Sequence, residues 1–164
     1  MNSRLCGALA GCVLILGVSP DAASRQQAAS ADIDVCVLLP RDEAMKIVGF
    51  QGAGRARSSK RSDAGMECNY NFGTRGTITI MVNRGTSKAK WDAFMKDLSA
   101  AGATLEAVPG VGDGAYFYDH DRLYAHSGNY EITISTTPSP GDDPAKMRTE
   151  KVALAKAVVA KLKS

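Results

Sequence analysis

Two adjoining stretches between Met66 and Gly85 constrain the fold of this chain most strongly. Apolar and polar residues alternate along each of them, with the apolar positions at Cys68, Tyr70, Phe72, Ile78, Ile80 and Val82. A period of two is typical of a strand that buries one face. Turn-forming residues from Gly73 to Gly76 separate the two stretches. The pattern therefore predicts a β-hairpin with one apolar side.

The N-terminus is built like a secretory signal. One positive charge, Arg4, precedes an uncharged apolar run from Leu5 to Val18. This run is shorter than the roughly 20 residues that a membrane-spanning helix needs. We therefore assign residues 1–31 to a signal peptide and polar spacer. Residues 32–164 are then a single domain that lies in the periplasm or is secreted.

Lipidation at Cys12 is the alternative. The segment Leu9–Cys12 reads Leu-Ala-Gly-Cys, which matches the lipobox of bacterial lipoproteins, where the cysteine carries the lipid and becomes the mature N-terminus. Two features argue against it, because the apolar segment before Cys12 is short and residues 13–18 would give the mature chain an apolar start. Only a chain lipidated at Cys12 is expected to be anchored to the envelope membrane.

Cys36 and Cys68 are the two cysteines outside the N-terminal apolar segment. An exported protein folds in an oxidising compartment, so one disulfide is their simplest use, and a pair of buried thiols is the alternative. The bridge would close a loop of about 33 residues and contribute roughly 3 to 4 kcal/mol on the chain-entropy estimate.

Capping residues and apolar periodicity predict three helices. They run from Pro40 to Gly49, from the N-cap Ser87 to about Ala101, and from Pro144 nearly to the end. In the second helix Trp91 falls on an apolar face and is expected in the core. Three further strands are expected at residues 115–118, 122–126 and 129–136, whereas residues 32–39 are expected to be extended.

The predicted fold class is α+β. About five strands form an antiparallel sheet in the order α-β-β-α-β-β-β-α, with three helices mainly on one face and one disulfide.

The segment from Gln51 to Gly65 contains several glycines and has no apolar periodicity, so it is expected to be a loop. Its basic residues are Arg55, Arg57, Lys60 and Arg61. One interpretation is a solvated loop, and the other is a basic loop that docks on an anionic partner. The chain's net charge of +3 is too weak to indicate nucleic acid binding. Tyr116 and Tyr118 are further binding candidates, unless the C-terminal helix half covers them.

One group of residues resembles a metal or acid–base site more than any other in the chain. It consists of Asp119, His120, Asp121 and His126. If the flanking strands pair, His126 lies too far from His120 to share an ion, and zinc sites usually need about four close ligands. A polar hairpin tip explains this cluster better. The chain also lacks the common nucleophile and metalloprotease motifs. We therefore expect no metal, cofactor or catalytic residue, and an enzyme is the less favoured class.

The spacing of cysteine and glycine residues over residues 36–162 resembles a pattern in small exported bacterial envelope domains. These domains include lipoproteins and sensor-like domains. The matching residues are Cys36-Val37-Leu38-Leu39, Glu43-Ala44, Gly49, Cys68-Asn69-Tyr70, Gly110-Val111-Gly112-Asp113-Gly114-Ala115 and Gly128. The resemblance implies a bridge from Cys36 to Cys68 and an α+β sandwich, and it carries over no catalytic residue.

The function expected from these observations is an exported binding or interaction module of the cell envelope. Its ligand would be an envelope protein, a glycolipid or a small molecule, bound by the open sheet face, the basic segment or the tyrosines. The alternatives are a small inhibitor of a secreted enzyme, or a hydrolase or metal-dependent enzyme that uses the region of His120.

Overall fold

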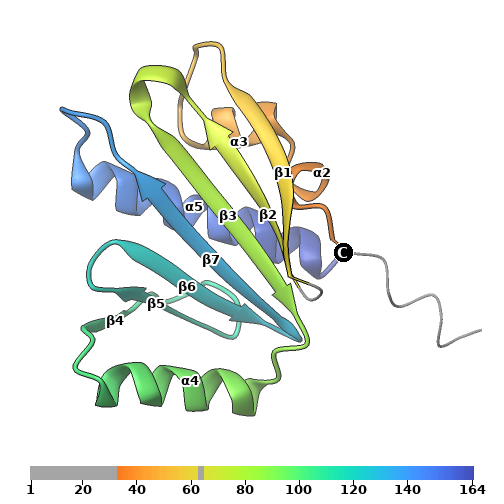
Figure 1. Cartoon of the computed structure of the whole chain (residues 1–164), viewed down its shortest axis with the longest axis vertical. Helices are drawn as coiled ribbons and strands as arrows, with labels where there is room; N and C mark the ends of the chain where they lie inside the picture. Colours follow the sequence, from red (N-terminus) through yellow and green to blue (C-terminus); the bar gives the residue numbers. More distant parts are fainter. Residues whose placement is uncertain (1–32, 63–64) are drawn as a thin grey trace, which may run out of the picture. The chain divides into compact units, whose positions relative to one another are not determined.

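The computed structural model describes residues 33–62 and 65–164, except for the side chains of residues 60–62. Within this part, seven strands form one sheet: β1 (Arg55–Ser62), β2 (Gly65–Asn71), β3 (Thr77–Arg84), β4 (Leu105–Ala107), β5 (Gly114–Tyr118), β6 (Arg122–Ser127) and β7 (Tyr130–Thr137). The order across the sheet is β1-β2-β3-β7-β6-β5-β4, and all neighbours are antiparallel (Figure 1). The predicted signal peptide, spacer and lipidation site lie outside the described residues.

Four α-helices accompany the sheet in the described residues: α2 (Val35–Leu38), α3 (Arg41–Ile47), α4 (Lys88–Ala100) and α5 (Pro144–Leu162). A short 3-10 turn, η2 (Gly73–Arg75), joins β2 to β3. The predicted α+β class with an antiparallel sheet is confirmed. The expected numbers were wrong, because the sheet has seven strands instead of about five and there are four helices instead of three.

One face of the sheet, here called the covered face, packs on α2, α3 and α5 (Figure 1). Every second residue of the central strands points into this core, as the alternation predicts, and Cys68, Tyr70, Ile80, Ile132 and Ile134 are fully buried. An ion pair of 2.9 Å between Lys161 and Glu43 links α5 to α3. This layer of helix against sheet is the main hydrophobic core.

The predicted hairpin is present as β2 and β3, joined at η2. Gly76 ends the turn with φ of +79°, and a Cβ atom there would lie only 2.1 Å from the carbonyl oxygen of Thr137 in β7. Positive φ and this close approach together require glycine.

The predicted disulfide between Cys36 and Cys68 is confirmed. It joins α2 to the middle of β2 beneath the sheet. The expectation of an extended segment at residues 32–39 was wrong over residues 35–38, because the Asp34 carboxylate accepts hydrogen bonds from the backbone N–H groups of Cys36 and Val37 and so caps one helical turn.

Tyr70 of β2 makes a second connection between the sheet and this N-terminal helical segment. Its hydroxyl donates a hydrogen bond of 2.6 Å to the carbonyl oxygen of Leu39 and lies 3.4 Å from that of Val35. Burial raises the pKa of Tyr70, so the hydroxyl stays protonated and remains a donor.

We expect Tyr70→Phe to lower the free energy of unfolding by about 1 to 2 kcal/mol, because the Leu39 carbonyl would lose its buried donor while the ring packing stayed unchanged. Urea unfolding measures the difference. Tyr116→Phe is the matched control, since Tyr116 is only half-buried. Equal stability of Tyr70→Phe and the wild type would show that this hydrogen bond does not hold the segment.

The segment at residues 51–65 was expected to be a loop, and this was wrong over residues 55–62. There it forms β1, an edge strand paired along β2 from Arg55 opposite Asn71 to Ser62 opposite Gly65. An edge strand rich in Arg, Lys and Ser lacks the apolar alternation that identifies a strand from sequence, because little of it is buried.

Helix α4 packs on the other face of the sheet from α5. Its Trp91 is buried, as predicted, and stacks on His126 of β6 at 5.6 Å between ring centroids. Phe94 meets Tyr124 of the same strand edge to face at 5.7 Å. Because α4 covers only the region of β5 and β6, the same face of β1, β2, β3 and β7 has no helix over it among the described elements (Figure 1).

Candidate functional site

The candidate site is this uncovered part of the sheet, which we call the open face. It holds two hollows. The basic hollow is lined by Arg55, Arg57, Asn69, Asn71 and Thr77. The aromatic hollow is lined by Glu67, Thr79, Met81, Phe94, Arg122, Tyr124, Glu131, Thr133 and Ser135.

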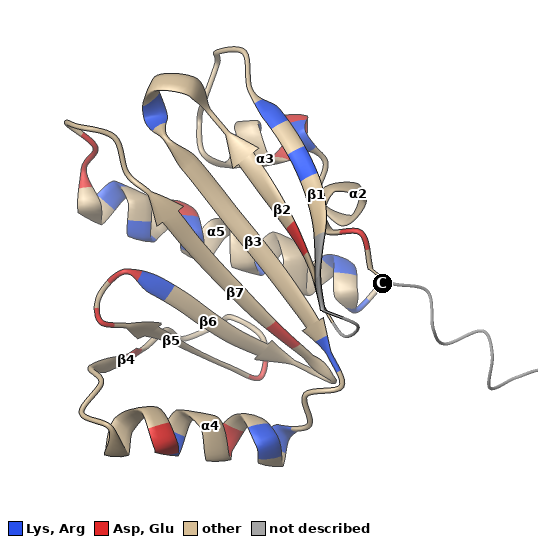
Figure 2. Cartoon of the chain, in the orientation of Figure 1, with Lys and Arg blue, Asp and Glu red and all other residues tan. Residues whose placement is uncertain are grey.

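The basic hollow has a volume of about 420 Å³ and is open to solvent. Arg55 and Arg57 are two residues apart on β1, so their side chains lie on the same face of the sheet. Both side chains are exposed. Figure 2 shows basic residues of the edge strand β1 in blue. Asn71 donates a weak hydrogen bond of 3.4 Å to Thr77 beside them. This end of the open face can therefore attract and hydrogen-bond an anionic group.

The aromatic hollow has a volume of about 220 Å³ and lies against α4. Tyr124 contacts Phe94 on one side and Tyr118 on the other, the latter at 6.1 Å between ring centroids. Arg122 donates a hydrogen bond of 3.3 Å to the Tyr124 hydroxyl, and this bond raises the pKa of Arg122. The second hollow thus combines aromatic surface with a permanently charged guanidinium.

Polar side chains connect the two hollows. Thr79 of the aromatic hollow donates a hydrogen bond of 2.7 Å to the amide oxygen of Asn69 in the basic hollow. The Glu67 carboxylate accepts hydrogen bonds from Ser59 at 2.7 Å and from Asn69 at 3.1 Å. The hydroxyl of Thr133 is buried and has no hydrogen-bond partner among the described residues. Hydrogen bonds through Asn69 therefore link side chains of the two hollows.

The structure brings some of the predicted binding residues to this site. Arg55 and Arg57 line the basic hollow, whereas the side chains of Lys60 and Arg61 are outside what the structure describes. Tyr118 lies beside the aromatic hollow through its contact with Tyr124. The neighbouring Asp119 carboxylate raises the pKa of Tyr118.

The alternative that the C-terminal helix half covers the two tyrosines is not what the structure shows. Phe117, between them in β5, points to α5, where the Arg148 guanidinium lies 3.9 Å from its ring centroid. Successive residues of a strand point to opposite faces, so Tyr116 and Tyr118 lie on the same side of the sheet as α4.

The cluster around His120 serves the packing of a hairpin tip. Lys151 of α5 is buried and donates to both the carboxylate and the carbonyl oxygen of Asp121. Arg148 donates to the carbonyl oxygen of His120 at 3.0 Å and pairs with Glu106 at 2.6 Å. These contacts tie the turn between β5 and β6 to α5, which is a structural role.

His126 lies at the opposite end of β6 from His120, as expected from the strand pairing. It is buried, and its Nε2 lies 2.9 Å from the carbonyl oxygen of Thr86. Among the described residues, no three or more His, Cys, Asp or Glu side chains lie in an arrangement that could hold a metal ion.

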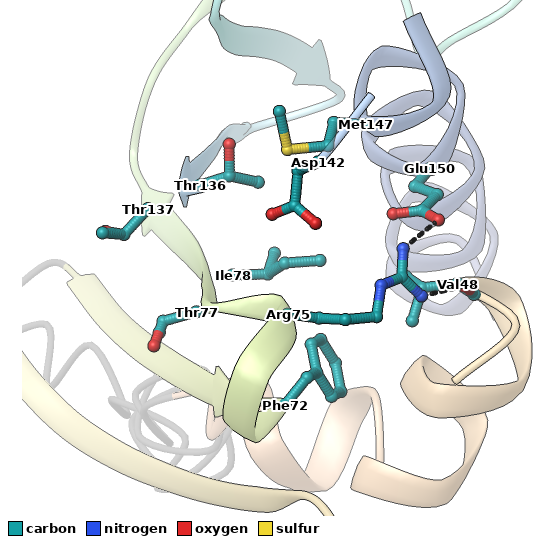
Figure 3. A pocket seen from close by; sticks show the side chains of 10 residues that line it. All are labelled: Val48, Phe72, Arg75, Thr77, Ile78, Thr136, Thr137, Asp142, Met147 and Glu150. Carbon is teal, nitrogen blue, oxygen red and sulfur yellow. Dashed lines mark hydrogen bonds and ion pairs between the residues drawn. The ribbon is translucent and has the colours of Figure 1, made fainter. Parts of the chain in front are cut away.

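A third hollow lies between the β2–β3 turn and α5 (Figure 3). Arg75 crosses it, pairing with Glu150 at 2.7 Å and donating to the carbonyl oxygen of Val48 at 3.0 Å. Its volume of about 10 Å³ is close to that of one water-sized probe. We therefore do not consider it a ligand site.

Sequence reasoning missed Asn69, Thr79, Arg122 and Tyr124 as site residues. A signal was present, because Asn69 and Thr79 occupy polar positions of the two alternating strands and so belong to one polar face. Nothing local to these residues indicates that a helix covers half of this face and leaves the other half open.

No helix within the described ranges is long and apolar enough to cross a membrane. The comparisons with known proteins find no matching family model, no similar curated protein and no similar solved structure. The resemblance to exported envelope domains therefore stays a prediction from the sequence.

Proposed function

We propose that this protein is an exported binding module of the bacterial cell envelope and that its ligand lies on the open face. The observation that carries the proposal is the pair of connected hollows, with arginines at the basic end and aromatic rings at the other. Ligand sites are usually hollows in which aromatic surface is combined with a few convergent polar groups.

Export is supported by the predicted signal and by the disulfide, since disulfides persist in oxidising compartments. On this proposal the protein is periplasmic or secreted, or is anchored to the membrane through Cys12. We propose no enzyme at the His120 turn, because the nearby Asp121 carboxylate and His120 carbonyl are engaged by α5.

The test is capture of a ligand from an envelope extract of the native host. Tagged full-length protein is compared with Arg55→Ser/Arg57→Ser and with the matched control Lys46→Ser/Lys156→Ser, whose lysines are exposed on α3 and α5. All three are incubated with the extract, and bound protein, lipid and glycan are identified by mass spectrometry.

We expect the wild type and the control to retain the same ligand and the arginine variant to bind it about a hundredfold more weakly, because it loses two charge-assisted hydrogen bonds that contribute roughly 1.5 to 3 kcal/mol each. Equal retention by all three proteins, or no reproducible ligand, would contradict a site on the open face.

A further inference from the structure

We propose that the open face binds a carboxylate-bearing oligosaccharide that lies across the strands, with acidic groups at Arg57 and Arg122. This inference rests on the proposed function and names its ligand class. Four features carry it, namely the spacing of the two arginines, the row of neutral polar side chains between them, two carboxylates beside that row and the aromatic rings at one end.

The two arginines lie on one row of facing residues across the sheet, Arg57 on the edge strand β1 and Arg122 on β6. Arg57 of β1 is opposite Asn69, Asn69 is opposite Thr79, and Thr79 is opposite Ser135 of β7. Arg122 precedes Leu123, which pairs with Ile134, so Arg122 extends the row beyond Ser135. Four strand spacings separate β1 from β6, which places the two backbones about 19 Å apart. A ligand that meets both charges must therefore be elongated.

The floor between the arginines is suited to hydroxyl groups. Asn69, Thr79 and Ser135 offer amide and hydroxyl groups along the row, and the buried Thr133 hydroxyl lies in the next row without a described partner. A sugar presents several hydroxyl groups per ring, each of which both donates and accepts, so it matches such a floor.

Two carboxylates make the site selective among anions. Glu67 of β2 and Glu131 of β7 both line the aromatic hollow. Their charge disfavours a ligand with dense negative charge, such as a nucleic acid or polyphosphate, while Glu131 can also accept a hydrogen bond from a sugar hydroxyl. The charge pattern therefore favours a ligand whose acidic groups are separated by neutral polar groups.

The aromatic end favours a saccharide over an acidic peptide. Phe94 and Tyr124 supply ring surface beside Arg122, against which the C–H groups of a sugar ring can pack while its carboxylate meets the guanidinium. A peptide would also need pockets for its apolar side chains, and among the described residues that line the two hollows Met81 is the one with an aliphatic side chain.

The test is calorimetric titration of purified protein, with its disulfide intact, against tetragalacturonate. The comparison ligands are the same tetrasaccharide with its carboxyl groups reduced, monogalacturonate, tetraglutamate and a short polyphosphate. Arg57→Ser and Arg122→Ser are compared with Lys46→Ser/Lys156→Ser, and circular dichroism verifies that each variant is folded.

We expect tetragalacturonate to bind the wild type and the control equally. Each arginine variant weakens this binding about tenfold, and the reduced tetrasaccharide and monogalacturonate bind at least tenfold more weakly than tetragalacturonate. The inference is overturned if tetraglutamate or polyphosphate binds as tightly, if Arg122→Ser has no effect, or if no saccharide binds. In the last case, arginine-dependent capture from the envelope extract would still support the open face as the site.

Discussion

Replacing Cys36 and Cys68 together by alanine is expected to lower the free energy of unfolding by about 3 kcal/mol. The bridge joins residues 32 positions apart, so without it the unfolded chain gains the conformations that a closed loop excludes. Cys68 is fully buried in the main core, and alanine there also leaves a small gap. The folded state changes less, because Tyr70 still holds the end of the α2 segment.

Guanidinium unfolding measures this effect, and the wild type treated with a reductant is the matched control. We expect the reduced wild type and the double variant to unfold at similar denaturant concentrations, both well below the oxidised protein. A loss under about 1 kcal/mol for both would show that packing, and not the bridge, holds α2 on the sheet.

Asp121→Ala is expected to destabilise the protein by about 2 kcal/mol, although Asp121 is largely exposed. The cause lies in its partner, because the Lys151 side chain is only 1% exposed and its ammonium would keep just the Asp121 carbonyl as an acceptor. Removing the partner of a buried charge leaves that charge without compensation, and this costs more than removing both members of the pair.

Lys151→Met tests whether the cost of Asp121→Ala comes from the Lys151 ammonium. The methionine side chain removes that charge and keeps a long apolar chain in its place. We expect Lys151→Met alone to cost about 1 kcal/mol or less, and Asp121→Ala added to it to cost almost nothing further. Thermal and urea unfolding of the four proteins give the double-mutant cycle. If Asp121→Ala cost the same in both backgrounds, the carboxylate would act independently of Lys151.

Local sequence was sufficient for the elements whose signals are strong. Alternating apolar residues specified β2 and β3, because one side of each strand is buried. Ser87 and Asp143 cap α4 and α5 with hydrogen bonds to nearby N–H groups, as capping predicts. The two cysteines outside the N-terminal segment were sufficient to predict the bridge.

The sequence analysis missed the two strands that are defined mainly by pairing with an adjacent strand. The basic segment at residues 55–62 becomes β1 because the backbone of β2 pairs with it, and backbone pairing leaves no pattern in the side chains of an edge strand. The strand β4 has three residues and pairs only with β5, so it carries too little periodicity to detect.

The sequence by itself therefore determined which side chains of each alternating strand are apolar and which are polar, because a strand's two faces follow from its period of two. Tertiary structure alone decided which polar side chains meet to form a site. Helix α4 packs its Trp91 and Phe94 on β6 and reaches no further across the sheet, while β1 adds Arg55 and Arg57 at the far edge. The open face is the space between them, and it depends on packing between segments far apart in the chain.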